Sequence, residues 1–144
     1  MSKRTAIGKE PFCGFFFYFR IGVFMLNTVK MKDNKDFMNL FKRGNYVCGK
    51  ACVVYFRKNG SAVNKLGIST GKKTGNAVVR SRCRRIIRQA YRENENSIPK
   101  GYDIIVVSRA GCGDCKSTDI SGFFKRKLIA AMNNKDYSKK RRKK

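Results

Sequence analysis

The stretch that decides the fold is Asn76-Ala-Val-Val-Arg-Ser-Arg-Cys-Arg-Arg-Ile-Ile-Arg-Gln-Ala-Tyr-Arg92. Its apolar residues recur at spacings of three and four, which is the repeat of one face of an α-helix. The residues in this repeat are Val79, Cys83, Ile86, Ile87 and Ala90. The pattern predicts a helix over residues 76–93 whose apolar stripe packs against a sheet or another helix.

The polar side of this predicted helix is occupied by arginine. Arg84, Arg88 and Arg92 follow one another at a spacing of four; Arg80, Arg82 and Arg85 flank them, and Ser81 shares the same side. Like charges at this spacing cost about a few tenths of a kcal/mol per pair, and no acidic residue interleaves. Guanidinium donates two parallel hydrogen bonds to phosphate, so a polyanion would stabilise the helix. The alternatives are a solvated basic face and an amphipathic helix lying on a membrane.

The composition supports a polyanionic partner. The chain has 144 residues with 34 Lys and Arg against 9 Asp and Glu, which gives a formal charge of +25. Nucleic acid is the default partner for such a charge, and an anionic membrane surface is the rival. The chain has no His and its carboxylates are scattered, which argues against a hydrolase built on protein side chains. We therefore predict no catalytic residues.

Before the arginine helix, the sequence predicts one short helix and two strands. The helix begins at Asp33 or Asn34, carries Phe37, Leu40 and Phe41 at helical spacing, and ends at Gly44. Strands are expected over residues 50–57 and 65–70, joined as an antiparallel hairpin through a turn at Asn59-Gly60. A basic loop over residues 71–75 then leads into the arginine helix.

After the arginine helix, we expect a buried strand over residues 102–109 and a last helix capped by Ser117 or Thr118. The buried stripe of that helix comprises Ile120, Phe123, Phe124, Leu128, Ala131 and Met132. The order α-β-β-α-β-α, with one further short strand near Tyr46, predicts a two-layer α+β domain with a mixed sheet of about four strands.

The two ends of the chain differ from this domain, which we place at residues 25–134. Residues 1–24 are expected to be a weakly structured apolar and basic extension, which would be absent if translation starts at Met25 or Met31. A membrane anchor or a signal peptide is the alternative, although the apolar run over residues 12–26 is short for a membrane span and is broken by Arg20. Residues 135–144 are expected to be a disordered basic tail.

At the arginine helix the sequence resembles the bacterial ribonuclease P protein family. That family carries the signature G-N-A-V-x-R-N-R-x-K-R-x-x-R, which here reads GNAVVRSRCRRIIR over residues 75–88. Residues 67–73, GISTGKK, resemble the approach to that signature, and the resemblance extends over about residues 25–134. Two positions depart from it: Ser81 stands where the family has Asn, and Arg84 where it has Lys.

The resemblance implies a fold, an activity and two binding surfaces. The fold has the central helix on the sheet in a left-handed β-α-β crossover, as in one domain of a small-subunit ribosomal protein. The activity is removal of the 5′ leader from precursor tRNA, catalysed by an RNA subunit that binds the protein about 1:1 and holds most of the Mg²⁺. The basic composition, without a convincing export signal, separately predicts a cytoplasmic protein. A non-catalytic ribosomal or single-strand RNA-binding protein is the alternative function. The RNA-binding residues would be Lys72, Lys73, Arg80, Ser81, Arg82, Arg84, Arg85 and Arg88.

Three aromatic residues form the second expected surface. Phe37 and Phe41 lie one helical turn apart, and Tyr55 lies on the strand face opposite Cys52, Val54 and Phe56. The sequence alone leaves open whether these three rings lie in the core or in a cleft, and the family resemblance implies a cleft for the leader. An exposed aromatic ring can stack a base, worth about 1–3 kcal/mol, without reading its identity.

The cysteines suggest no further site. Cys112 and Cys115 form a CxxC motif, and Cys48 with Cys52 forms a looser pair. Four thiolates could hold zinc, but placing one pair on a single strand is a poor match to a zinc knuckle. We therefore predict reduced cysteines, no metal site in the protein and no tightly bound cofactor.

Overall fold

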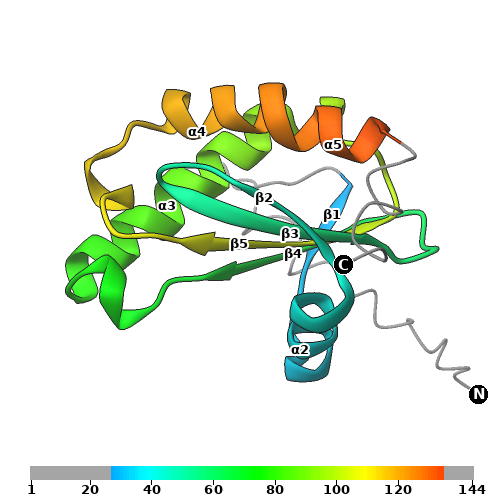
Figure 1. Ribbon diagram of the computed structural model, residues 1–144, viewed down its shortest axis with the longest axis horizontal. Helices are drawn as coiled ribbons and strands as arrows, with labels where there is room; N and C mark the ends of the chain where they lie inside the picture. Colours follow the sequence, from blue (N-terminus) through cyan, green and yellow to red (C-terminus); the bar gives the residue numbers. More distant parts are fainter. Residues whose placement is uncertain (1–26, 135–144) are drawn as a thin grey trace, which may run out of the picture.

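The computed structural model describes residues 27–134 and contains a five-stranded mixed sheet. The strands are β1 (Thr28–Lys30), β2 (Asn45–Cys48), β3 (Cys52–Lys58), β4 (Asn64–Ser69) and β5 (Tyr102–Ser108). Their order is β1-β4-β5-β3-β2, so β5 lies at the centre (Figure 1). It pairs in parallel with β4 and antiparallel with β3, while β1 pairs in parallel with β4 and β2 pairs antiparallel with β3. The expectations for residues 1–24 and 135–144 lie outside the described residues.

The sheet confirms the α+β class and corrects the predicted strand pairing. The short strand near Tyr46 is present as β2, but the three residues of β1 were missed, which makes five strands rather than four. The predicted hairpin of the strands over residues 50–57 and 65–70 is wrong, because β5 lies between these two strands, β3 and β4. Asn59 connects to β5 instead: its backbone N–H donates to Gly101 O at 2.9 Å, and its amide Nδ2 donates to Asp103 Oδ1 at 2.9 Å.

Besides short 3-10 turns, residues 27–134 form three helical segments beside the sheet. The first is α2 (Asn34–Arg43) and the second is α3 (Ala77–Asn94). The third begins as α4 (Ser117–Phe123), continues through a π-helical segment (Phe124–Ile129) and ends as α5 (Ala130–Asn133). Its first turn is closed by Asp119, whose Oδ2 accepts from the Lys116 backbone N–H at 3.0 Å, rather than by the predicted cap at Ser117 or Thr118.

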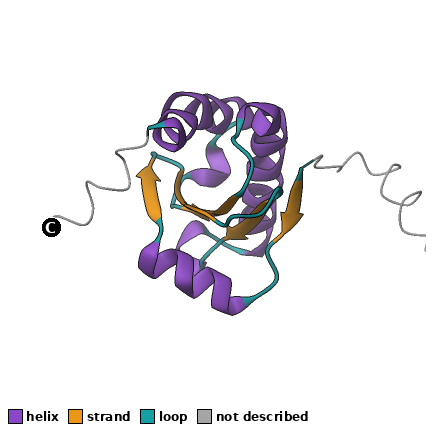
Figure 2. Cartoon of the chain, turned by 90° about the vertical axis from the view of Figure 1, so that its right-hand side faces the viewer, coloured by secondary structure: helices purple, strands orange, loops and turns teal. Residues whose placement is uncertain are grey.

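The helices lie on both faces of the sheet, so the predicted two-layer arrangement is incomplete. Figure 2 shows α3 and the C-terminal helix on one side of the strands and α2 on the other. The main core lies under α3 and the C-terminal helix and includes Val54, Ile87, Ile104 and Phe124, each 0 % exposed. The α2 side holds a smaller cluster of three buried residues, Met31, Leu40 and Ile105. The described residues therefore close one face of the sheet and cover the other only in part.

Candidate nucleic-acid interface

The helix α3 turns its apolar stripe inward and its arginines outward. Its first turn is capped by Asn76, whose Oδ1 accepts from the Val79 N–H at 2.9 Å. The buried residues are Cys83, Ile87, Ala90, Tyr91 and Asn94, while Ser81, Arg82, Arg85 and Arg88 are exposed. The ion pair found within residues 27–134 joins Lys65 to Asp36 and involves none of these arginines. Their charges face solvent, and no carboxylate of residues 27–134 forms an ion pair with them.

Two of the predicted RNA-binding arginines lie at the border of the apolar stripe rather than on the opposite side. Arg84 is half-buried, and its Nη1 donates to Thr70 Oγ1 at 2.9 Å. Arg80, one helical turn earlier, is also half-buried, and its Nε is buried with no hydrogen-bond partner among the described residues. Arg80 and Arg84 are four residues apart, so they lie on the same side of α3, next to the buried Cys83 and Ile87. Arg84 thus ties α3 to the end of β4 as well as carrying charge.

The predicted basic loop is held against the sheet by a buried hydroxyl pair. It forms a short 3-10 turn over Lys72–Thr74, in which Lys72 and Lys73 are exposed and Thr74 is buried. The two hydroxyl oxygens, Thr74 Oγ1 and Ser108 Oγ, lie 2.8 Å apart. The turn immediately precedes α3, so both lysines lie at the N-terminal end of the arginine helix.

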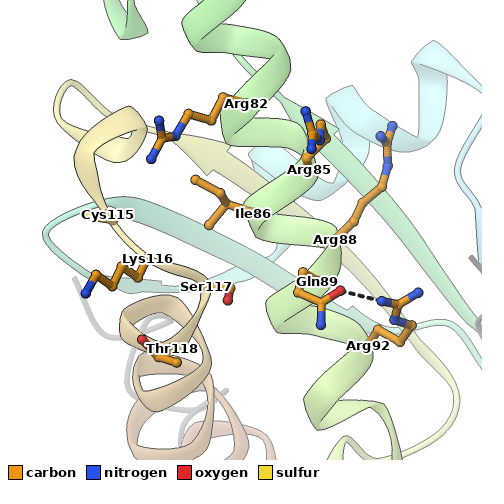
Figure 3. A pocket seen from close by; sticks show the side chains of 10 residues that line it. All are labelled: Arg82, Arg85, Ile86, Arg88, Gln89, Arg92, Cys115, Lys116, Ser117 and Thr118. Carbon is orange, nitrogen blue, oxygen red and sulfur yellow. Dashed lines mark hydrogen bonds between the residues drawn. The ribbon is translucent and has the colours of Figure 1, made fainter. Parts of the chain in front are cut away.

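A groove with a volume of about 800 Å³ runs between α3 and the start of the C-terminal helix (Figure 3). One wall comes from α3 and the other from the segment around α4. Sequence spacing identified Arg82, Arg85, Arg88 and Arg92 but could not identify the second wall, which is remote in the chain. The lining residues are Arg82, Arg85, Ile86, Arg88, Gln89, Arg92, Cys115, Lys116, Ser117 and Thr118.

The aromatic residues meet on the partly covered face of the sheet. The Phe41 and Tyr55 rings pack edge to face with centroids 4.8 Å apart, and the Phe37 centroid lies 6.5 Å from that of Phe41. All three are partly buried and pack against the small α2-side core. Sequence reasoning missed Tyr46, which lies opposite Tyr55 across the β2–β3 pair, with ring centroids 5.8 Å apart. We define these four rings as the aromatic surface.

A glycine allows α2 to lie this close to the sheet. A Cβ atom at Gly67 on β4 would stand 2.5 Å from Phe37 Cζ, closer than side-chain carbons approach one another. The Lys65 ammonium, two residues earlier on the same face, donates to Asp36 Oδ2 at 3.1 Å. This hydrogen bond, with the Asp36 charge, raises the pKa of Lys65. The two contacts hold the first turns of α2 against β4.

The described cysteines are free, and three of them belong to the core. Cys52, Cys83 and Cys112 are buried, Cys115 is partly exposed and Cys48 is exposed. Burial raises the pKa of the Cys52 thiol to about 12, and burial together with the Cys83 thiol raises that of Cys112. Within residues 27–134 there is no group of three or more His, Cys, Asp or Glu side chains suited to a metal ion.

No helix within the described part of the chain has both the length and the apolar character needed to cross a membrane.

Comparison with known proteins identifies relatives by sequence. The family model described as "Ribonuclease P" matches residues 25–132. The ribonuclease P protein component of Lachnoclostridium phytofermentans is 42% identical over 91 residues, which cover 63% of this chain and 78% of that protein. That of Oceanobacillus iheyensis is 32% identical over 117 residues, covering 77% of this chain and 97% of the relative.

Solved structures give the same result. The RNase P protein of Staphylococcus aureus aligns with a TM-score of 0.62 at 34% identity, covering 71% of this chain and 94% of that chain. The Thermotoga maritima protein aligns with a TM-score of 0.63 at 30% identity, covering 71% of this chain and 96% of that chain. Sequence and structure therefore agree over the described domain, and the chain belongs to the ribonuclease P protein family, as a protein component of that tRNA-processing endoribonuclease.

Proposed function

We propose that this subunit binds the catalytic RNA of ribonuclease P through α3 and the preceding basic loop, and binds the 5′ leader of precursor tRNA on the aromatic surface. The contacts to the RNA subunit would come from Lys72, Lys73, Arg80, Ser81, Arg82, Arg84, Arg85 and Arg88. One observation carries the proposal: the exposed arginines of α3 have no ion-pair partner within the described residues. Such a face gains free energy when counterions are released from RNA phosphates.

The aromatic surface supports the leader-binding part of the proposal. Phe37, Phe41 and Tyr55 are partly buried, so each presents part of its ring and uses the rest to pack on the sheet. Rings fixed in this way can stack bases without a large entropic cost and without discriminating among them. A platform of this kind suits an enzyme whose substrates carry different leaders.

We propose that the RNA subunit performs the chemistry and holds most of the Mg²⁺, in a complex of about one protein per RNA in the cytoplasm. In this division the protein contributes positive charge and positioning, and no side chain of this chain acts as a catalytic acid, base or nucleophile. The RNA backbone would lie along α3, the connection between the parallel strands β4 and β5. The left-handed sense of that crossover stays a prediction.

Reconstitution tests this proposal. The protein is added to the cognate RNA subunit and precursor tRNA at low Mg²⁺, and 5′ cleavage is followed. We expect the protein to increase the rate of leader removal and the effect to weaken steeply with salt, by roughly 0.7 to 0.9 in log affinity per log salt for each phosphate contacted. RNA binding without faster cleavage would instead support the alternative function of a non-catalytic RNA-binding protein.

A further inference from the structure

The groove between α3 and the C-terminal helix differs in chemistry from an ordinary phosphate-binding surface. Among the described residues that line it are five cationic side chains and no carboxylate, as expected for RNA. Between them lies Ile86, half-buried and packed against the main core on one side. Ser117 and Thr118 add two hydroxyls, and Gln89 adds an amide that already donates to Glu93 Oε1 at 2.9 Å and accepts from Arg92 Nη2. Figure 3 shows the Ile86 side chain on the side of α3 that faces the segment around α4, with Arg82 on the same side and Arg85 and Arg88 farther round the helix.

The shape of the groove limits which form of RNA can fill it. An A-form duplex presents a convex surface of phosphates and riboses, and its bases are stacked inside. A duplex could contact the outer arginines of α3 but would leave the apolar floor and the hydroxyls of the groove without partners. An unpaired nucleotide can turn its base inward while its phosphates stay at the rim. Protein modules that bind single-stranded RNA combine cations for the backbone with a surface for the bases in this way.

We propose that this groove seats unpaired nucleotides of the RNA that the subunit binds. A base lies against Ile86, its polar edge faces Ser117 or Thr118, and the flanking phosphates are bound by Arg85, Arg88 and Lys116. The proposal rests on the proposed function in that it takes RNA as the partner. It adds a second site for unpaired RNA, on the face of the sheet opposite the aromatic surface, and brings the start of the C-terminal helix into RNA recognition.

Chemical footprinting of the cysteines tests the proposal on the full chain. Cys115 lines the groove and is partly exposed, whereas Cys48 is exposed and does not line it. The protein is treated with iodoacetamide, alone or with a labelled single-stranded oligoribonucleotide of about 12 nucleotides or a duplex of the same length, and modification is quantified by mass spectrometry. At single-strand concentrations near ten times Kd, we expect modification of Cys115 to slow by about tenfold, whereas the duplex should leave it unchanged. Cys48, two residues from Tyr46 on β2, reports binding at the aromatic surface separately. Protection of Cys115 by the duplex to the same extent, or by neither RNA, would overturn the proposal.

A groove-filling variant gives a second, independent measurement. Thr118 is exposed in the first turn of α4, so Thr118→Trp should fold normally and place an indole over the groove without changing the charge. We expect it to weaken binding of the single strand by about tenfold, the loss of a stacked base, and to leave duplex binding unchanged. The matched control is Asn133→Trp, at the exposed far end of the C-terminal helix.

The two proposals can fail separately. If wild-type protein stimulates 5′ cleavage but Thr118→Trp binds the single strand as tightly as Asn133→Trp does, the groove proposal is wrong while the proposed function stands. If wild-type protein does not stimulate cleavage, the proposed function fails whatever the footprint shows.

Discussion

The two faces of the sheet are built for different tasks. On one face, α3 and the C-terminal helix bury a continuous core that includes Ile87, Ile104 and Phe124, each 0 % exposed. On the other face, α2 buries three residues and leaves the rings of the aromatic surface partly exposed. The closed face supplies most of the burial that stabilises the domain. The open face has little stabilising burial to lose and can expose rings to a ligand.

The largest expected difference between the two faces is in the free energy of unfolding. Ile87→Ala removes a fully buried side chain beneath α3 and should lower the free energy of unfolding by about 2–5 kcal/mol, the transfer and cavity cost of such a change. Phe37→Ala on the open face should cost less, because its ring is already partly exposed. Urea denaturation of both variants measures the difference. Equal losses would show that the two faces contribute alike and would break the comparison.

The next largest effect is on RNA affinity, through the exposed arginines of α3 that cover the closed face. The pair Arg85→Glu and Arg88→Glu should weaken binding of the catalytic RNA by about 100-fold and reduce the slope of log affinity against log salt by about 1.4 to 1.8, if each arginine contacts one phosphate. Both side chains are exposed, so thermal unfolding should change little. Filter binding over a range of salt concentrations measures the affinity and the slope.

A charge-matched control separates local contact from bulk charge. Lys125→Glu with Lys127→Glu makes the same change in net charge at exposed positions of the C-terminal helix outside the groove. We expect a much smaller loss of affinity from this control. Equal losses from the two pairs would mean that RNA responds to total charge rather than to the α3 surface.

The open face should matter for substrate rather than for the RNA subunit. Phe41→Ala removes a ring that packs edge to face on Tyr55, and should cost about 1–3 kcal/mol of affinity for precursor tRNA if it stacks one leader base. Binding of mature tRNA, which lacks the leader, should not change. The holoenzyme is therefore assayed with both tRNAs, and equal weakening of both would place the effect outside leader recognition.

The sequence predicted the closed face better than the open one, for a physical reason. The stripes of α3 and of the C-terminal helix are long and periodic, so burial can be read from spacing, and the structure confirms both. β1 has three residues and depends on partners remote in the chain: Thr28 Oγ1 donates to Glu95 Oε1 at 2.8 Å. The same limit explains the incorrect hairpin, because no local pattern shows that β5 enters between β3 and β4.

The candidate site divides in the same way. The exposed arginines follow from helical spacing, but the groove needs α4 as a second wall, and the position of α4 is set by tertiary packing. Arg84 shows the limit most clearly. Its type and spacing predict a phosphate contact, whereas its hydrogen bond to Thr70 depends on where β4 ends.

That hydrogen bond leads to the smallest expected effect. Thr70→Val removes the hydroxyl that accepts from Arg84 Nη1 without changing the charge of the protein. Loss of this hydrogen bond should cost about 0.5–1.5 kcal/mol, either in the free energy of unfolding or in the free energy of RNA binding. Thr70 directly precedes the loop of Lys72 and Lys73. If Arg84 positions that loop for RNA, Thr70→Val should weaken binding of the catalytic RNA by a few-fold while thermal unfolding changes little.

A double-mutant cycle identifies the route of this effect. In a background of Lys72→Ala with Lys73→Ala, the loop has no charge left to position, so Thr70→Val should have almost no further effect on RNA affinity. A full additional loss in that background would mean that the bond acts on Arg84 itself, by orienting its guanidinium toward phosphate. If Thr70→Val lowers the free energy of unfolding but leaves the affinity for the catalytic RNA unchanged, the hydrogen bond stabilises the fold and does not contribute to RNA binding.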